Sequence, residues 1–156
     1  MNKKLIPLVA VLAVLSLSLF GLVLPASADQ VYHTERIMLA PVGGAPLHTG
    51  FVVNNHSNGP VNFAHEMYVL VGASPDNSYQ MVLNVYLQNT TCQGDPDALL
   101  PTAILTTNTR GNGEANAAVL LEAVEGLHGL EIGVIWTLKN GNTVDYQTSC
   151  TAVTLD

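Results

Sequence analysis

The sequence predicts an all-β fold, a single antiparallel β-sandwich that follows an N-terminal signal helix. Three features support this prediction: an apolar leader, segments with apolar residues at alternate positions, and clusters of Gly, Pro and Asn between those segments. A period of two is the mark of a strand with one face in a core. Many short strands at near-regular spacing are typical of antiparallel sandwiches or barrels. We therefore expect one Ig-like or jelly-roll-like domain over residues 29–156.

Residues 1–28 have the pattern of a secretory signal peptide. A short positive segment, Lys3-Lys4, precedes an almost wholly apolar run, and Ala26-Ser27-Ala28 then matches a signal peptidase site. The alternative is an uncleaved membrane anchor, because about 20 apolar residues can span a bilayer. We predict cleavage after Ala28. The protein would then be secreted, either extracellular or in the cell envelope, and would keep no membrane contact.

The strongest strand patterns lie in the middle and near the end of the chain. Apolar residues alternate over Tyr79–Leu87 and again over Ile132–Leu138. After the second run, Asn140-Gly141 predicts a two-residue type I′ hairpin, because both central residues of that turn need positive φ. The returning strand is predicted over Thr143–Leu155. Further candidate strands are Val31–Leu39, Leu47–Val53, Val61–Phe63, Met67–Val71 and Leu99–Thr106.

The segment Glu114–Glu125, EANAAVLLEAVE, fits two structures. Its Ala, Leu and Glu residues are good helix formers, and Gly126 would suit the C-terminal cap of a helix. In a strand, Ala115, Ala117 and Val119 would share one face. We favour a strand over Ala115–Leu121, because its neighbours on both sides are predicted strands and propensity yields to context.

Cys92 and Cys150 are the only cysteines of the chain. Outside the cytosol such a pair most often forms a disulfide. The alternative is that one of them is a nucleophile or a metal ligand, but the pair has neither redox nor zinc spacing. We predict a Cys92–Cys150 disulfide.

The charge of the chain narrows the choice of partners. The formal net charge is −7 at pH 7 and becomes −9 once Lys3 and Lys4 leave with the leader. The remaining cations are Arg36, Arg110 and Lys139. Three cations cannot neutralise the phosphates of DNA or RNA, so we expect no nucleic acid partner. Attraction to an anionic membrane surface fails for the same reason.

The polar stretch TTNTRGNG, residues 106–113, lies between two predicted strands. Gly111 and Gly113 permit left-handed backbone, and Asn108 and Asn112 tolerate it, so a tight connection is the first interpretation. The alternative is ligand binding through Asn108 and Asn112, or calcium binding through these two residues, Glu114 and loop carbonyls. The stretch lacks the alternating acidic ligands of a calcium loop.

Ser78 to about Ala115 contains SYQMVLNVYL, then a Cys, then LTTNTRGNGEA. This combination resembles secreted bacterial and archaeal β-sandwich proteins of unknown activity. The resemblance covers under a third of the chain that follows Ala28. It implies a secreted sandwich, and it brings no catalytic or binding residues with it.

The remaining candidate residues are few. A metal site assembled from distant residues would use His56, His65 and Glu66. His65-Glu66 begins like the zinc helix H-E-x-x-H, but Val69 stands where the second His belongs. Tyr86 falls between Asn84 and Gln88 on the more polar face of its strand, which makes it the aromatic candidate for surface ligand binding.

No motif for nucleophilic catalysis or phosphate binding is present in the sequence. We therefore expect a secreted, non-catalytic protein without a cofactor and with a binding or surface-structural role. Its ligand would be an extracellular protein or glycan. The alternative is a metal-binding protein or metal-dependent enzyme that uses His56 and His65.

Overall fold

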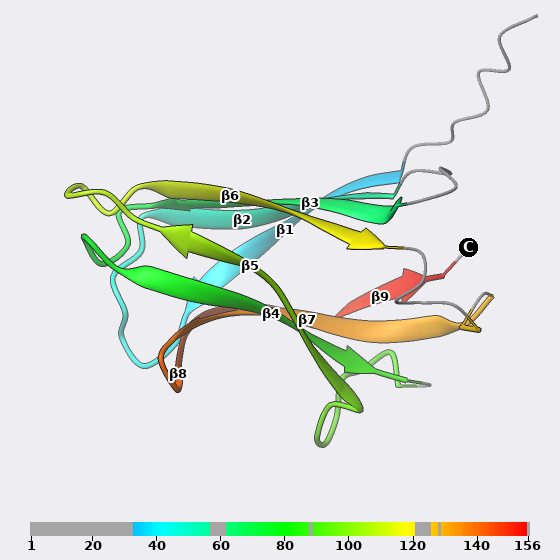
Figure 1. Ribbon diagram of the computed structural model, residues 1–156. Helices are drawn as coiled ribbons and strands as arrows, with labels where there is room; N and C mark the ends of the chain where they lie inside the picture. The colour runs from blue at the N-terminus through cyan, green and yellow to red at the C-terminus, as the bar shows by residue number, and fades with distance from the viewer. Residues whose placement is uncertain (1–32, 57–61, 88, 121–125, 128, 156) are drawn as a thin grey trace, which may run out of the picture.

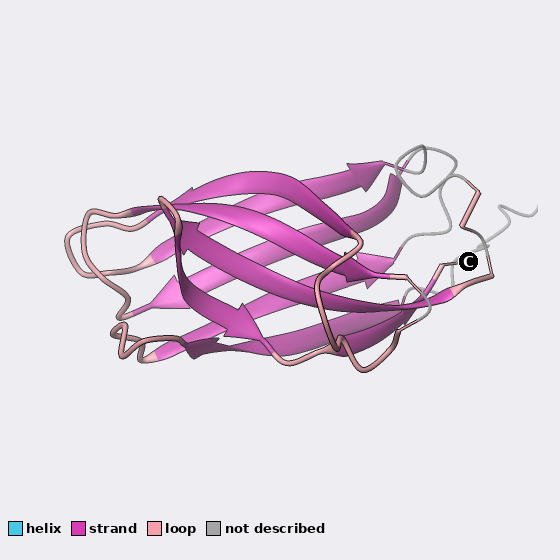
Figure 2. Cartoon of the chain, turned by 90° about the horizontal axis from the view of Figure 1, so that it is seen from below, coloured by secondary structure: helices cyan, strands magenta, loops and turns pink. Residues whose placement is uncertain are grey.

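The computed structural model describes residues 33–56, 62–87, 89–120, 126–127 and 129–155, so the predicted signal peptide lies outside it. In this part of the chain Figure 2 shows strands joined by loops and no helix. None of the described residues forms a helix able to cross a membrane. The strands are β1 (His33–Pro41), β2 (Thr49–His56), β3 (Asn62–Val71), β4 (Ser78–Tyr86), β5 (Ala98–Thr106), β6 (Gly113–Leu120), β7 (Glu131–Asn140), β8 (Thr143–Thr148) and β9 (Thr151–Thr154).

The strands form one antiparallel sheet that nearly closes into a barrel (Figure 1). Its order is β5-β4-β7-β8-β1-β2-β3-β6, and β9 pairs with β7 beside β8. β1 changes partner along its length, because residues 33–38 pair with β2 and residues 39–41 pair with β8. The predicted all-β antiparallel fold is confirmed. The predicted sandwich is not, because β1 joins the two layers into one sheet.

The division of the chain into strands differs from the prediction at β3 and at β8–β9. The sequence predicts separate strands over Val61–Phe63 and Met67–Val71, but β3 is continuous. Glu66, in the middle of β3, points inward and finds hydrogen-bond partners there, so this charged residue does not end the strand. The predicted strand Thr143–Leu155 instead divides at Ser149-Cys150 into β8 and β9, which pair with different halves of β7.

The structure also tests the predictions for Glu114–Glu125 and for the hairpin at Asn140-Gly141. The strand interpretation is confirmed by β6 as far as Leu120, while residues 121–125 lie outside the described part of the chain. The hairpin between β7 and β8 exists, but Asn140 pairs with Thr143, so its central residues are Gly141 and Asn142. Among these two only Gly141 has positive φ, at 60°. The turn therefore has glycine at its first central position, as type II′ requires. The predicted type I′ turn was wrong, because the two central residues lie one position later in the chain than Asn140-Gly141.

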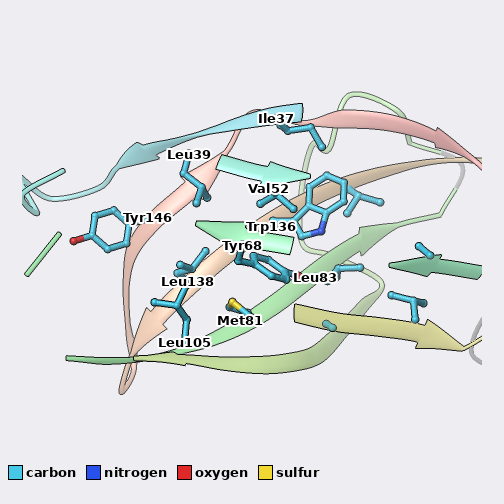
Figure 3. Close-up of a cluster of buried hydrophobic side chains, with 14 of the residues drawn as sticks. Ile37, Leu39, Val52, Tyr68, Met81, Leu83, Leu105, Trp136, Leu138 and Tyr146 are labelled. Carbon is cyan, nitrogen blue, oxygen red and sulfur yellow. The ribbon is translucent and has the colours of Figure 1, made fainter. Parts of the chain in front are cut away.

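The interior is filled by side chains from all nine described strands. Figure 3 shows Tyr68, Met81 and Trp136 extending into the space between the strands. The largest of the fully buried side chains are Trp136 and three tyrosines, Tyr68, Tyr79 and Tyr146. Burial of aromatic side chains of this size dominates the energy of such cores. The alternation over β4 and β7 therefore predicted the inward faces of these two strands correctly.

The predicted disulfide is present. Cys92, in the connection between β4 and β5, bonds to Cys150, in the break between β8 and β9, with a Cα–Cα distance of 5.8 Å. β4 and β9 flank β7 on its two sides, so the connection crosses the outer face of β7. It passes directly over Gly133, where an added Cβ would lie 2.8 Å from Cys92 Sγ and 2.3 Å from the carbonyl oxygen of Asn89.

Candidate functional site

A cavity of about 130 Å³ lies between the strands at one end of the barrel, where β4 and β6 finish and β7 begins. This is the right-hand end in Figure 1. Most of its wall is aliphatic. The main contributors are Leu83, Val85, Leu100, Val119, Val134 and Val153. Leu87 also lines the cavity and is 37% exposed, so the cavity comes close to the surface at this end of the barrel.

Three polar side chains interrupt the aliphatic wall: Asn54 and His56 from β2 and Glu66 from β3. Asn54 and His56 share a face because they are two residues apart in a strand. Glu66 joins them because it is the register partner of Asn54. Directly opposed residues in an antiparallel pair have adjacent side chains. Strand pairing thus gathers these polar groups at one place in an otherwise apolar cavity.

Glu66 is the best-buried charged residue of the described chain, with 2% of its surface exposed. Its Oε1 accepts a hydrogen bond of 2.8 Å from Trp136 Nε1, and its Oε2 accepts one from the Tyr68 hydroxyl. The Tyr68 hydroxyl also lies 3.1 Å from Thr102 Oγ1. These contacts link β3, β7 and β5 through the interior, so they hold opposite walls of the barrel together.

Burial dominates the acid–base behaviour of this network. It raises the pKa of Glu66, and the hydrogen bonds from Tyr68 and Trp136 oppose that rise only in part. The pKa of Tyr68 is also raised, first by burial and then by the nearby charge of Glu66. Removal from water penalises the charged form of each group. Tyr68 therefore stays a neutral hydrogen-bond donor.

Asn54 has an incomplete set of hydrogen bonds. Its side chain is 3% exposed, and its Nδ2 lies 2.8 Å from His56 Nε2, to which it donates when that ring nitrogen carries no proton. Its Oδ1 is buried and has no hydrogen-bond partner in the described structure. Buried polar atoms in native proteins are nearly always paired. An unpaired acceptor in a residue that lines a cavity is the feature expected where a ligand supplies the partner.

The residues considered for a metal site are only partly brought together. His56 and Glu66 both line the cavity. His65 is adjacent to Glu66 in β3, and it lies exposed on the opposite face of the strand. Successive strand residues point to opposite faces, so His65 and Glu66 cannot approach one point. Among the described residues no group of three His, Cys, Asp or Glu side chains could hold a metal ion.

Tyr86 was predicted at the surface, and that placement is wrong. Only 7% of its surface is exposed. Its register partner is Gly133, and the connection that carries Cys92 packs over this point of β7. The polar neighbours of Tyr86 suggested a solvated face, but a covering loop cannot be seen in an alternation pattern.

Asn108 and Asn112 serve the connection between β5 and β6. The Oδ1 of Asn108 accepts hydrogen bonds from the backbone N–H groups of Arg110 and Asn112, at 2.8 and 3.1 Å. The Oδ1 of Asn112 accepts from the N–H of Gly72, at 3.1 Å. Gly111 has φ of +74°, and an added Cβ would meet the carbonyl oxygen of Ala73 at 2.0 Å. These contacts fasten the turn to the connection between β3 and β4, which fits the turn interpretation.

Asn54 and Trp136 are the site residues that sequence reasoning missed. The alternation Val52-Val53-Asn54-Asn55-His56 could have placed Asn54 and His56 on the inward face of Val52. Their proximity to Glu66 depends on the register between β2 and β3, which alternation does not determine.

Comparisons with protein-family models, with curated proteins and with solved structures found no match to this chain.

Proposed function

We propose that this chain is an exported, non-catalytic binding protein that holds a small and largely apolar molecule in the cavity at the end of its barrel. The observation that carries the proposal is the cavity itself, with aliphatic walls and three polar groups together on one side. Small-molecule sites generally combine apolar walls with a few convergent polar groups that set orientation. The Cys92–Cys150 disulfide supports a location outside the cytosol.

The size of the cavity limits the ligand. A volume of about 130 Å³ is close to that of a dry apolar cavity of about 150 Å³ that accepts benzene. A single six-membered ring or a short branched chain would fill it. A glycan or peptide would not fit in this volume, so we propose a small molecule as the ligand of the cavity, in place of the protein or glycan expected from the sequence.

The arrangement of Glu66 favours binding over catalysis. Each of its carboxylate oxygens already accepts a hydrogen bond, from Trp136 and Tyr68 respectively. A general base must reach the proton that it removes, and its own partners must leave room for that contact. Glu66 is instead held in place by these two hydrogen bonds, as a polar group in the wall of the cavity.

Trp136 allows a direct test, because it lines the cavity and is the only tryptophan of the chain. Toluene titrated into the purified protein should change the intrinsic fluorescence saturably. Its binding should also raise the unfolding temperature, since a ligand that binds only the folded state stabilises that state.

A matched pair of variants assigns the binding to the cavity. Ala64 is buried and lines the cavity, so Ala64→Leu should fill the space and abolish toluene binding. Ala118→Leu makes the same change at an exposed position of the neighbouring strand β6 and should leave binding intact. If neither toluene nor phenol gives a saturable signal, or if Ala64→Leu binds toluene as well as the parent protein does, the proposed function is wrong.

A further inference from the structure

We propose that the ligand of this cavity carries a hydroxyl group that donates a hydrogen bond to Asn54 Oδ1, so that the protein selects small alcohols or phenols over hydrocarbons of the same size. This inference rests on the proposed function and names the chemical class of the ligand. Its basis is the unpaired, buried Oδ1 of a residue that lines the cavity.

The donors near Asn54 are already engaged. The indole N–H of Trp136 and the hydroxyl of Tyr68 both donate to Glu66. The amide nitrogen of Asn54 is directed at His56. None of these groups reaches the Oδ1 of Asn54 in the described structure, where that atom has no partner. A donor delivered from the cavity would complete the hydrogen bonding of Asn54 without disturbing the network around Glu66.

The polar side of the cavity is lined by residues that carry hydrogen-bond acceptors. Asn54 has the unpaired Oδ1, and Glu66 adds two further oxygens on the same side, each of which already accepts a hydrogen bond from Trp136 or Tyr68. A carbonyl or carboxylate of a ligand would meet these oxygens with lone pairs facing lone pairs. A hydroxyl offers a proton to the acceptors instead. The geometry therefore favours a hydroxyl and opposes a carboxylate ligand.

Burial makes this preference effective. Asn54 is 3% exposed and Glu66 is 2% exposed, so bulk water does not compete for their oxygens. A site built to hydrogen-bond a ligand group discriminates strongly against an analogue that lacks the group, because the buried protein atom is then left unpaired. The aliphatic wall would bind the hydrocarbon part of either ligand equally.

Phenol and toluene form the matched ligand pair, since a hydroxyl replaces a methyl group of similar size. Their dissociation constants should be measured by Trp136 fluorescence on the parent protein, on Asn54→Leu and on Asn55→Leu. Leucine matches asparagine in shape and removes its polar atoms. Asn55 is the next residue along β2, where its Oδ1 accepts from the Thr34 hydroxyl at 2.8 Å in an exposed setting, so Asn55→Leu is the matched control.

The expected result is a change of about tenfold in the ratio of the phenol and toluene dissociation constants on going to Asn54→Leu, at the expense of phenol. Asn55→Leu should keep the parent ratio. Benzaldehyde, which accepts but does not donate, should bind the parent protein more weakly than phenol, and this comparison needs no variant to fold.

The outcomes separate the two proposals. If neither phenol nor toluene binds the parent protein, the proposed function fails and this inference fails with it. If toluene binds and the ratio is the same in Asn54→Leu, only the role of Asn54 is overturned. Tighter binding of benzaldehyde than of phenol also overturns it, because Asn54 would then present its amide N–H groups to the cavity.

Discussion

Gly133 offers a quantitative test of how the disulfide shapes the fold. In Gly133→Ala the new Cβ would lie 2.3 Å from the carbonyl oxygen of Asn89, whereas ordinary contacts begin at 3.4 Å. The connection above β7 would have to retreat by about 1 Å to restore a normal contact. Cys92 cannot follow freely, because Cys150 holds it from the other side of β7. Overpacking of this kind typically costs about 1–3 kcal/mol, and we expect about 2–3 kcal/mol here.

The measurement is a double-mutant cycle by urea unfolding, with Gly133→Ala made in the parent protein and in Cys92→Ala/Cys150→Ala. Without the bridge the connection can lift away, so the cost of Gly133→Ala should fall by about 1–2 kcal/mol, which is a normal coupling between contacting sites. Gly44→Ala is the control: φ is +81° there and nothing lies within 4 Å of the new Cβ, so its cost comes from the backbone alone. That cost should not change between backgrounds. An equal cost of Gly133→Ala in both backgrounds would refute the argument.

Two further predictions concern the bridge and the buried carboxylate. Cys92→Ala/Cys150→Ala should lower the free energy of unfolding by about 4 kcal/mol, because the cysteines are 58 residues apart and the cross-link restricts the unfolded chain; a loss below about 1 kcal/mol in urea unfolding would contradict this. Burial raises the pKa of Glu66 above its usual 4.5, so the folded state binds a proton at this carboxylate more tightly than the unfolded chain does. The free energy of unfolding should therefore fall as pH rises from about 4.5 through the raised pKa. Glu66→Gln should remove this fall when the free energy of unfolding in urea is measured against pH. If the profiles of the parent protein and Glu66→Gln are parallel, Glu66 does not cause the pH dependence.

Local features of the fold could be predicted from the sequence. The alternation over Tyr79–Leu87 and Ile132–Leu138 identified β4 and β7, because a strand with one buried face imposes that pattern on its residues. The cysteine pair followed from composition, and the strand at β6 followed from its neighbours. Each of these inferences needed only residues close in sequence or a pair with a single possible partner.

Features that depend on pairing between distant strands could not be predicted. Nothing in His33–Pro41 indicates that its last residues leave β2 for β8, so closure of the sheet was missed. Glu66 was considered as a metal ligand because His65-Glu66 begins like the zinc motif H-E-x-x-H. Its actual partners, Tyr68 and Trp136, converge on it only in the folded barrel. Likewise, the cavity exists because inward side chains from several strands leave a space between them, and such a space cannot be predicted from the sequence pattern of any one strand.

Because β1 pairs with both β2 and β8, it affects the order in which the strands can pair during folding. Leu39 meets Thr148, roughly a hundred residues later, so the first strand cannot complete its hydrogen bonds until nearly the whole polypeptide has been synthesised. Contacts so distant along the chain form slowly, because the intervening loop must first be ordered. The sheet of a nascent chain therefore stays open until the residues of β8 have been synthesised. In the exported protein that we propose, β1 would pair with β8 only after translocation across the membrane.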